Sequence, residues 1–235
     1  MSHHSNSEEQ LEEIKEFLAK TWKIIVAIIA IGLFAIWGWR YWQSHQKQLS
    51  VDASDRYQQL ITELDNNGDP QSADALVKFA DETDTIYSVF ANLKAAQFYV
   101  EESKDYAKAE ELLIAASKET GSESVLATIN LRLARIQMQL EKYSNALTTV
   151  NKVKNESWAA TANDLKGDIL VKMDQIQNAI DAYQTALLAK PTVELEKNIK
   201  IKLNQAEYLR NQIEPTDNKA DGTETTSSDE NTVQE

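Results

Sequence analysis

The sequence predicts an all-α protein in which a single N-terminal transmembrane helix precedes a solenoid of helical hairpins. Three observations lead to this fold class. Residues 24–39 form an uncharged, apolar run of sixteen residues. Between residues 50 and 213, apolar side chains recur every three or four positions, and no stretch alternates as a β-strand requires. The 235 residues include only six glycines and three prolines, which suits long helices.

The apolar run predicts a membrane anchor at residues 22–42, which leaves residues 1–21 as an N-terminal segment before the membrane. Sixteen helical residues cover ~24 Å, less than the ~30 Å hydrocarbon core of a bilayer, so the flanking residues must extend the span. Aromatic rings and long cationic side chains suit the two headgroup regions. We therefore expect six residues at the membrane interfaces: Trp22, Lys23, Trp39, Arg40, Tyr41 and Trp42. Three lysines before the run against two cations after it favour a cytoplasmic N-terminus by one residue.

A cleaved signal peptide and a buried core helix are the alternative interpretations of this run. A signal peptide has a shorter apolar region and small residues at its cleavage site, whereas GWRYW follows here and five glutamates precede the run. A core helix of a soluble protein has a polar face, which residues 24–39 lack. The anchor is therefore the preferred interpretation.

Residues 43–213 are predicted to form the folded domain, built from consecutive helical hairpins. In each predicted helix the apolar residues follow spacings of three and four, which places them on one face. The paired faces are Val89, Leu93, Ala96 and Val100 with Tyr106, Ala109, Leu113 and Ala116; Leu126, Ile129, Leu133, Ile136 and Leu140 with Tyr143, Ala146, Leu147, Val150 and Val153; and Leu165, Ile169 and Met173 with Ile176, Ile180, Tyr183 and Leu187. A final helix is expected to cover the open end of the core through Leu195, Ile199, Leu203, Ala206 and Leu209.

A small residue recurs at the same place in successive hairpins and defines a repeat. The aligned residues are Ala73, Ala109, Ala146 and Ala179, at steps of 36, 37 and 33 residues. These steps are close to the 34-residue tetratricopeptide period, in which small side chains let two helices approach closely. The last hairpin fits that consensus best, through Gly167, Ala179, Tyr183, Ala186 and Pro191. The sequence therefore predicts a tetratricopeptide-like solenoid.

Two local signals predict helix boundaries in this region. Asp69 is expected to cap a helix that begins at Pro70, because a carboxylate can accept from the free amides of the first turn. Gly121 is expected to adopt a left-handed conformation after a helix.

Residues 214–235 form an acidic segment without aromatic residues, and we predict that it is disordered. A solubilising role is the preferred interpretation, and binding to a basic partner surface is the alternative. The whole chain has a formal charge of −13 and no basic stretch interleaved with aromatics. This composition argues against a nucleic-acid partner.

The sequence contains no catalytic, cofactor-binding or metal-binding motif, so we predict a binding protein rather than an enzyme. Cysteine is absent, and His3, His4 and His45 lie in the N-terminal tail or just past the anchor. Glycine-rich phosphate loops, nucleophile elbows and HExxH are also absent. The abundant carboxylates fall on polar helix faces with lysines nearby, as on a solvated surface.

The candidate functional surface is the face lined by the first helix of each hairpin. In the predicted register this face exposes an aromatic ring and a methionine among mixed charges, which suits adaptable peptide capture. The predicted partner-binding residues are Lys94, Phe98, Leu131, Arg135, Met138, Asp168 and Lys172. The alternative is that Phe98, Leu131 and Met138 fill the packing between repeats.

Three separated motifs stand out beyond the repeat pattern. They are GWRYWQSHQ at residues 38–46, NLRLARIQMQL at residues 130–140 and WAATANDLKGDIL at residues 158–170. The first motif and the pair Arg132 and Arg135 do not follow from a generic tetratricopeptide pattern. Together the motifs resemble the YfgM-like family, ancillary subunits of the bacterial SecYEG translocon. The resemblance runs from about residue 8 to about residue 208, and the acidic tail departs from it.

The resemblance implies an inner-membrane protein with its N-terminus in the cytoplasm and its tetratricopeptide-like domain in the periplasm. It implies association with SecYEG and the periplasmic chaperone PpiD, and a role in passing emerging proteins to periplasmic chaperones. Unfolded client proteins and the Rcs response regulator are further partners that it suggests, and it carries no catalytic residues. The alternatives are an envelope scaffold, a stress-signalling regulator and an accessory subunit of an enzyme.

Overall fold

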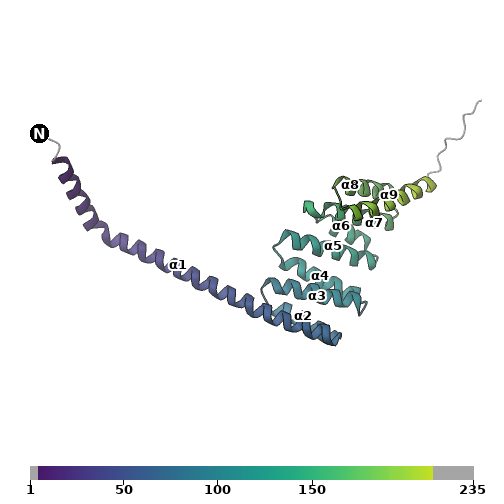
Figure 1. Cartoon of the computed structure of the whole chain (residues 1–235), viewed down its shortest axis with the longest axis horizontal. Helices are drawn as coiled ribbons and strands as arrows, with labels where there is room; N and C mark the ends of the chain where they lie inside the picture. Colours follow the sequence, from purple (N-terminus) through teal and green to yellow (C-terminus); the bar gives the residue numbers. More distant parts are fainter. Residues whose placement is uncertain (1–4, 214–235) are drawn as a thin grey trace, which may run out of the picture. The chain divides into compact units, whose positions relative to one another are not determined.

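The computed structural model describes residues 5–213, and all regular structure in that range is helical. The helices are α1 (Ser5–Asn67), α2 (Pro70–Glu82), α3 (Ile86–Glu101), α4 (Tyr106–Glu119), α5 (Glu123–Gln139), α6 (Tyr143–Val150), the short 3₁₀ helix η1 (Glu156–Trp158), α7 (Ala159–Lys172), α8 (Ile176–Leu188) and α9 (Val193–Ile213) (Figure 1). The prediction of an all-α fold with one N-terminal candidate membrane helix is confirmed. The tail predicted to be disordered, residues 214–235, lies outside the described residues, as do His3 and His4.

The apolar run lies within α1, which continues through it as a single helix (Figure 1). Ile28, Ile29 and Ile31 lie on different sides of the helix, because each residue turns it by about 100°, and they are 64%, 56% and 69% exposed. From Ala19 onward the helix is long and apolar enough to cross a membrane. Water solvates such an apolar surface poorly, whereas a helix satisfies its own backbone in lipid, so a bilayer is the environment that suits it.

Aromatic rings gather where the apolar run ends. Trp37 stacks with Tyr41 at a centroid distance of 6.2 Å, and Trp39 lies 5.7 Å from Trp42. These pairs are three and four residues apart, so they share a helix face. No helix boundary falls at residue 42, because α1 continues to Asn67. The interface role of these residues remains a prediction.

The remaining helices form a second compact unit of stacked hairpins, whose described part is residues 63–213 (Figure 1). Each helix from α2 to α9 packs against the next one along the chain. The three predicted hairpins are confirmed as α3–α4, α5–α6 and α7–α8. In addition, α5 contacts α7 and α7 contacts α9.

The four aligned alanines are buried between helices, as the repeat predicts. All four are fully buried, at 0% exposure: Ala73, Ala109, Ala146 and Ala179. Each stands five positions after a residue with positive φ in the turn that precedes its helix: Gly68, Lys104, Glu141 and Asp174 respectively. Three of these four turn residues carry side chains, although the left-handed region favours glycine.

Hydrogen bonding explains how two of these turns close their helices. After α5, the amide of Glu141 donates to the carbonyl of Met138 at 3.1 Å, and the amide of Lys142 donates to the carbonyl of Gln137 at 2.8 Å. After α7, the amides of Asp174 and the following residue donate to the helix in the same pattern. This is the Schellman arrangement, which satisfies carbonyls that the helix end would otherwise leave free.

One predicted helix boundary is confirmed and the other is wrong. Asp69 caps α2, accepting from the amide of Ser72 at 2.8 Å, and Pro70 occupies the first turn. Gly121 does not adopt positive φ; Gly68 does, at 61°. The connection from α4 to α5 stays extended at Thr120 and Ser122, so it needs no left-handed residue.

The last helix covers the end of the core as predicted. Ile199 and Ala206 of α9 are buried against a cluster from α7 and α8 that includes Ile180 and Tyr183. The other three predicted contacts, Leu195, Leu203 and Leu209, pack partly buried against the same cluster. A solenoid needs such a cap because its final hairpin would otherwise expose an apolar face.

Candidate partner-binding groove

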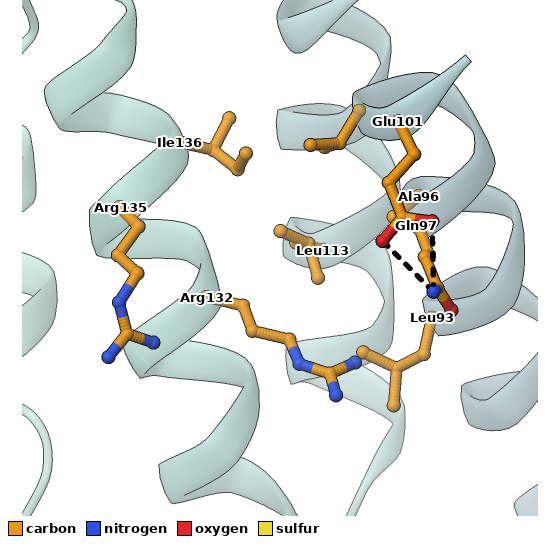
Figure 2. Close-up of a pocket in the computed structure, with 9 residues that line it drawn as sticks. Leu93, Ala96, Gln97, Glu101, Leu113, Arg132, Arg135 and Ile136 are labelled. Carbon is orange, nitrogen blue, oxygen red and sulfur yellow. Dashed lines mark hydrogen bonds between the residues drawn. The ribbon is translucent and has the colours of Figure 1, made fainter.

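A groove lies between α3 and α5, the first helices of two successive hairpins (Figure 2). Its volume is about 360 Å³. Whereas α5 packs directly against α7, the groove separates α3 from α5, and Leu113 of α4 lies between them. We define the α3–α5 groove as this depression and its lining residues: Leu93, Ala96, Gln97, Val100, Glu101, Leu113, Arg132, Arg135 and Ile136.

Apolar side chains from three helices form the floor of the α3–α5 groove. Leu113 and Ile136 are 3% and 8% exposed and belong to the core of the stack. Ala96 is also buried, and Leu93 and Val100 are half-buried on α3. Because the buried members are fixed by packing, this floor exists before any ligand arrives. An apolar side chain placed there would lose contact with water at no cost in refolding.

The two walls of the groove carry opposite charges. On α3, the amide Nε2 of Gln97 donates to both carboxylate oxygens of Glu101 at 3.1 Å. On α5, Arg132 and Arg135 are exposed, and Arg132 extends across the groove toward Leu93 (Figure 2). No hydrogen bond or ion pair joins either guanidinium to the side chains that the structure describes. The groove therefore presents hydrogen-bond acceptors on one wall and charged donors on the other.

Of the seven predicted partner-binding residues, Arg135 is the one that lines this groove. Lys94 and Phe98 line a separate depression of about 200 Å³ around Gly68, where Lys94 Nζ is 3.1 Å from Asp65. Phe98 is only 7% exposed and meets the ring of Tyr99 edge-on. The prediction that Phe98 is exposed is wrong, because this position faces the neighbouring helices.

Leu131 and Met138 lie on the side of α5 that faces the next hairpin. Leu131 is 2% exposed and packs with Ala146 and Ile169, so its predicted exposure is also wrong. Met138 is half-buried against the same cluster. The alternative interpretation, packing between repeats, is therefore correct for Phe98 and Leu131.

Asp168 is held in a polar cluster that joins α7, α8 and α9. Its carboxylate accepts from Tyr183 Oη at 2.9 Å and from Lys202 Nζ at 2.7 Å. Lys202 also donates to Asp164 at 2.9 and 3.0 Å. Asp168 is thus engaged within the domain, while Lys172 remains exposed at the end of α7. A partner role for either residue remains a prediction.

Burial and charge shift the protonation equilibria of this cluster. Burial raises the pKa of Asp164, against the hydrogen bond from Lys202 and the charge of Arg135. Burial also opposes the charge on Lys202, but hydrogen bonds and attraction to Asp168 and Asp164 outweigh it and raise the pKa of Lys202. The pKa of Tyr183 is raised well above its ordinary value by burial and then by Asp168. Both shifts favour the protonated forms of Tyr183 and Lys202 in the folded protein.

The sequence reading missed most of the groove because it assigned Leu93, Val100, Leu113 and Ile136 to a closed core. One feature of the sequence was consistent with a gap between these two hairpins. The step from Ala109 to Ala146, at 37 residues, is the longest of the three steps between aligned alanines, and it spans the α3–α4 to α5–α6 junction where the groove lies.

Among the residues that the structure describes, no group of three or more histidine, aspartate or glutamate side chains is arranged so that it could hold a metal ion.

An apolar helix without a protein core around it, followed by stacked helical hairpins, defines a tetratricopeptide-like protein with one candidate membrane helix. The family model of the tetratricopeptide repeat-like domain matches residues 15–208. Two curated relatives are each named ancillary SecYEG translocon subunit. The protein from Escherichia coli (strain K12) is 35% identical over 204 residues, which cover 87% of this chain and 98% of the relative. The protein from Haemophilus influenzae is 30% identical, over 87% of this chain and 99% of the relative. The chain belongs to the YfgM-like family of ancillary SecYEG translocon subunits.

A solved structure shows the same fold at lower similarity. MamA 41-end from Desulfovibrio magneticus RS-1 is 17% identical, has a TM-score of 0.50, and covers 70% of this chain and 94% of its own. That likeness concerns the fold alone.

Proposed function

We propose that this protein is an ancillary subunit of the SecYEG translocon in the bacterial inner membrane. Residues 22–42 span the bilayer, residues 1–21 lie in the cytoplasm, and residues 43–213 stand in the periplasm. There the domain helps to transfer emerging proteins to periplasmic chaperones. PpiD is a partner of the protein, and the Rcs response regulator links it to envelope-stress signalling. The protein acts by binding and not by catalysis.

The observation that carries this proposal is the extent of the family relationship. The 35% identity to the Escherichia coli relative covers 98% of that relative, so it includes both the apolar helix and the hairpin stack. Sequence identity confined to the hairpin stack would support translocon association only weakly, because tetratricopeptide-like stacks bind many different partners.

The geometry supports an adaptor in two ways. A single apolar helix confines the chain to the membrane plane, which raises the effective concentration of its binding surfaces near other membrane proteins. The α3–α5 groove then offers a preformed apolar floor with charged walls, a combination suited to a short polypeptide segment.

Topology is tested by protease digestion of spheroplasts that express the full chain with a tag at its N-terminus. We expect the protease to remove the region after Trp42 while the tagged N-terminal fragment survives. Intact protein in spheroplasts that is degraded only after lysis would contradict the proposed orientation.

Translocon association is tested by chemical cross-linking in native membranes followed by purification of the full chain. We expect SecY and PpiD among the cross-linked proteins. As a control, residues 22–42 are replaced by an unrelated membrane span of equal length, which separates simple tethering from recognition by the anchor. Recovery of wall-synthesis proteins without SecY would favour the envelope scaffold.

A further inference from the structure

We infer that the α3–α5 groove binds an extended polypeptide segment in which bulky apolar side chains stand beside carboxylates. This inference rests on the proposed function, because it names the class of polypeptide that an adaptor of this kind would hold. It concerns the binding chemistry of the groove alone and is measured without the translocon.

The floor selects for an apolar side chain. Leu113 and Ile136 are buried at the base, and half-buried Leu93 and Val100 line the side formed by α3. The groove volume of about 360 Å³ is at the lower end of the ~300–1,000 Å³ typical of ligand pockets. It therefore suits one or two large side chains and not a folded domain.

The α5 wall selects for carboxylates. Two other cations of the stack are already engaged: Lys94 lies 3.1 Å from Asp65, and Lys202 bridges two aspartates of α7. Arg132, by contrast, has no hydrogen-bond or ion-pair partner among the described side chains, whereas the charge of Arg135 already acts on Asp164 of α7. A guanidinium offers several donors in a plane and binds a carboxylate through two hydrogen bonds. Since Arg132 extends across the floor, a carboxylate bound to it would lie beside the seated apolar side chain.

The α3 wall favours a polypeptide over an anionic lipid. Glu101, held by Gln97, can accept from a backbone amide of an extended chain. The same carboxylate repels a phosphate headgroup and a second acidic side chain placed against α3. Because the two walls differ in sign, a ligand must carry donors and carboxylates on opposite sides, which a peptide does.

The test uses the full chain purified into nanodiscs of phosphatidylcholine, so that no translocon and no anionic lipid is present. The probe is a fluorescein-labelled peptide, Gly-Ser-Leu-Phe-Asp-Glu-Ser-Gly, measured by fluorescence anisotropy. Two matched peptides carry Lys-Lys in place of Asp-Glu, or Ser-Ser in place of Leu-Phe. We expect each matched peptide to bind at least about tenfold more weakly, the loss typical of removing a charge-assisted contact or a large apolar contact.

Two variants locate the site on the molecule. Arg132→Glu should weaken binding of the acidic peptide at least about tenfold and improve binding of the lysine peptide. Lys152→Glu makes the same change of charge at an exposed position outside the groove and should leave both affinities within about twofold. Both positions are exposed, so neither variant is expected to unfold the domain.

Each outcome decides the inference. The inference would be overturned if all three peptides bound with equal affinity. It would also be overturned if Arg132→Glu left the affinity for the acidic peptide unchanged. Binding to phosphatidylglycerol vesicles that depends on Arg132, with no binding of the peptide, would assign the groove to a lipid instead. Cross-linking of the Arg132→Glu variant to SecY is measured in parallel. If the Arg132→Glu variant still cross-links to SecY but no longer binds the peptide, both proposals are supported. If the wild-type chain binds the peptide but does not cross-link to SecY, the proposed function alone is refuted.

Discussion

Replacing Gly167 by alanine adds a methyl group where α7 and α8 approach most closely. An alanine Cβ at this position would lie 2.3 Å from Cε1 and 2.5 Å from Cδ1 of the Tyr183 ring. Tyr183 is 2% exposed, and its hydroxyl is held by Asp168 at 2.9 Å. The ring therefore cannot rotate away without losing that hydrogen bond, and it cannot move outward without separating α8 from α7.

The expected cost is the difference between two opposing effects. Overpacking of a closed core costs ~1–3 kcal/mol, and a weakened hydrogen bond to a charged group adds ~1–2 kcal/mol. Alanine in place of glycine inside a helix returns ~1 kcal/mol through its higher helix propensity. The net expectation for Gly167→Ala is a destabilisation of ~1–4 kcal/mol, or a fall in Tm of ~2–16 °C for a domain of this size.

The assay is thermal and urea unfolding of the full chain in detergent micelles, followed by circular dichroism. Gly121→Ala is the matched control, because no atom lies within 4 Å of its added methyl group and its expected change is below ~0.5 kcal/mol. The double variant Gly167→Ala with Tyr183→Leu removes the ring and should be less unstable than the two single changes together predict. A Gly167→Ala protein as stable as the wild type, or more stable, would refute the close-approach argument.

Three other predictions concern the turns and the polar cluster. Lys202→Met should destabilise the stack by ~1–2 kcal/mol and speed hydrogen exchange in α9. The reason is that Asp164 and Asp168 would lose their cation while remaining partly buried. Unchanged exchange in α9 would contradict this. Tyr183→Phe should flatten the loss of stability above pH 10. The raised pKa of Tyr183 means that the native state holds this proton more tightly, so its contribution is complete below pH ~10 and declines as pH rises further, as urea unfolding at pH 9 and pH 11 would measure. Glu141→Gly should stabilise the domain by ~0.5–1 kcal/mol because φ is 58° at this position. The control Glu123→Gly, within α5, should instead destabilise the domain by a similar amount. Equal effects of the two changes on the urea midpoint would show that the turn is unstrained.

Local periodicity was sufficient to predict the hairpins and their small-residue contacts. Ala109 and Ala146 are both at 0% exposure because the repeat requires a small side chain where two helices cross. The cap helix was predictable for a similar reason, since Ile199 and Ala206 lie on one face at a spacing of seven.

Placement of the binding surface depended on contacts that one helix does not encode. Leu131 belongs to an apolar face of α5, but whether that face meets a partner or the next hairpin depends on how α7 packs against it. Lys202 binds Asp164, 38 residues earlier in the chain, and periodicity within α9 contains no information about that partner. The width of the gap between α3 and α5 is likewise a property of two hairpins together.

The constant distance between each left-handed turn and its buried alanine has a consequence for engineering the stack. From Gly68 to Ala73 and from Asp174 to Ala179 the interval is five residues, although the repeats themselves differ in length. Differences in repeat length must therefore reside elsewhere: in the remainder of the second helices, where α4 has 14 residues and α6 has 8, in the first helices, and in the connections between hairpins. The connection from α4 to α5, residues 120–122, is the place where a designer could insert or delete residues to widen or narrow the gap between α3 and α5. The length of this connection could then change which ligands the groove prefers, while the α3–α4 and α5–α6 hairpins keep their sequences.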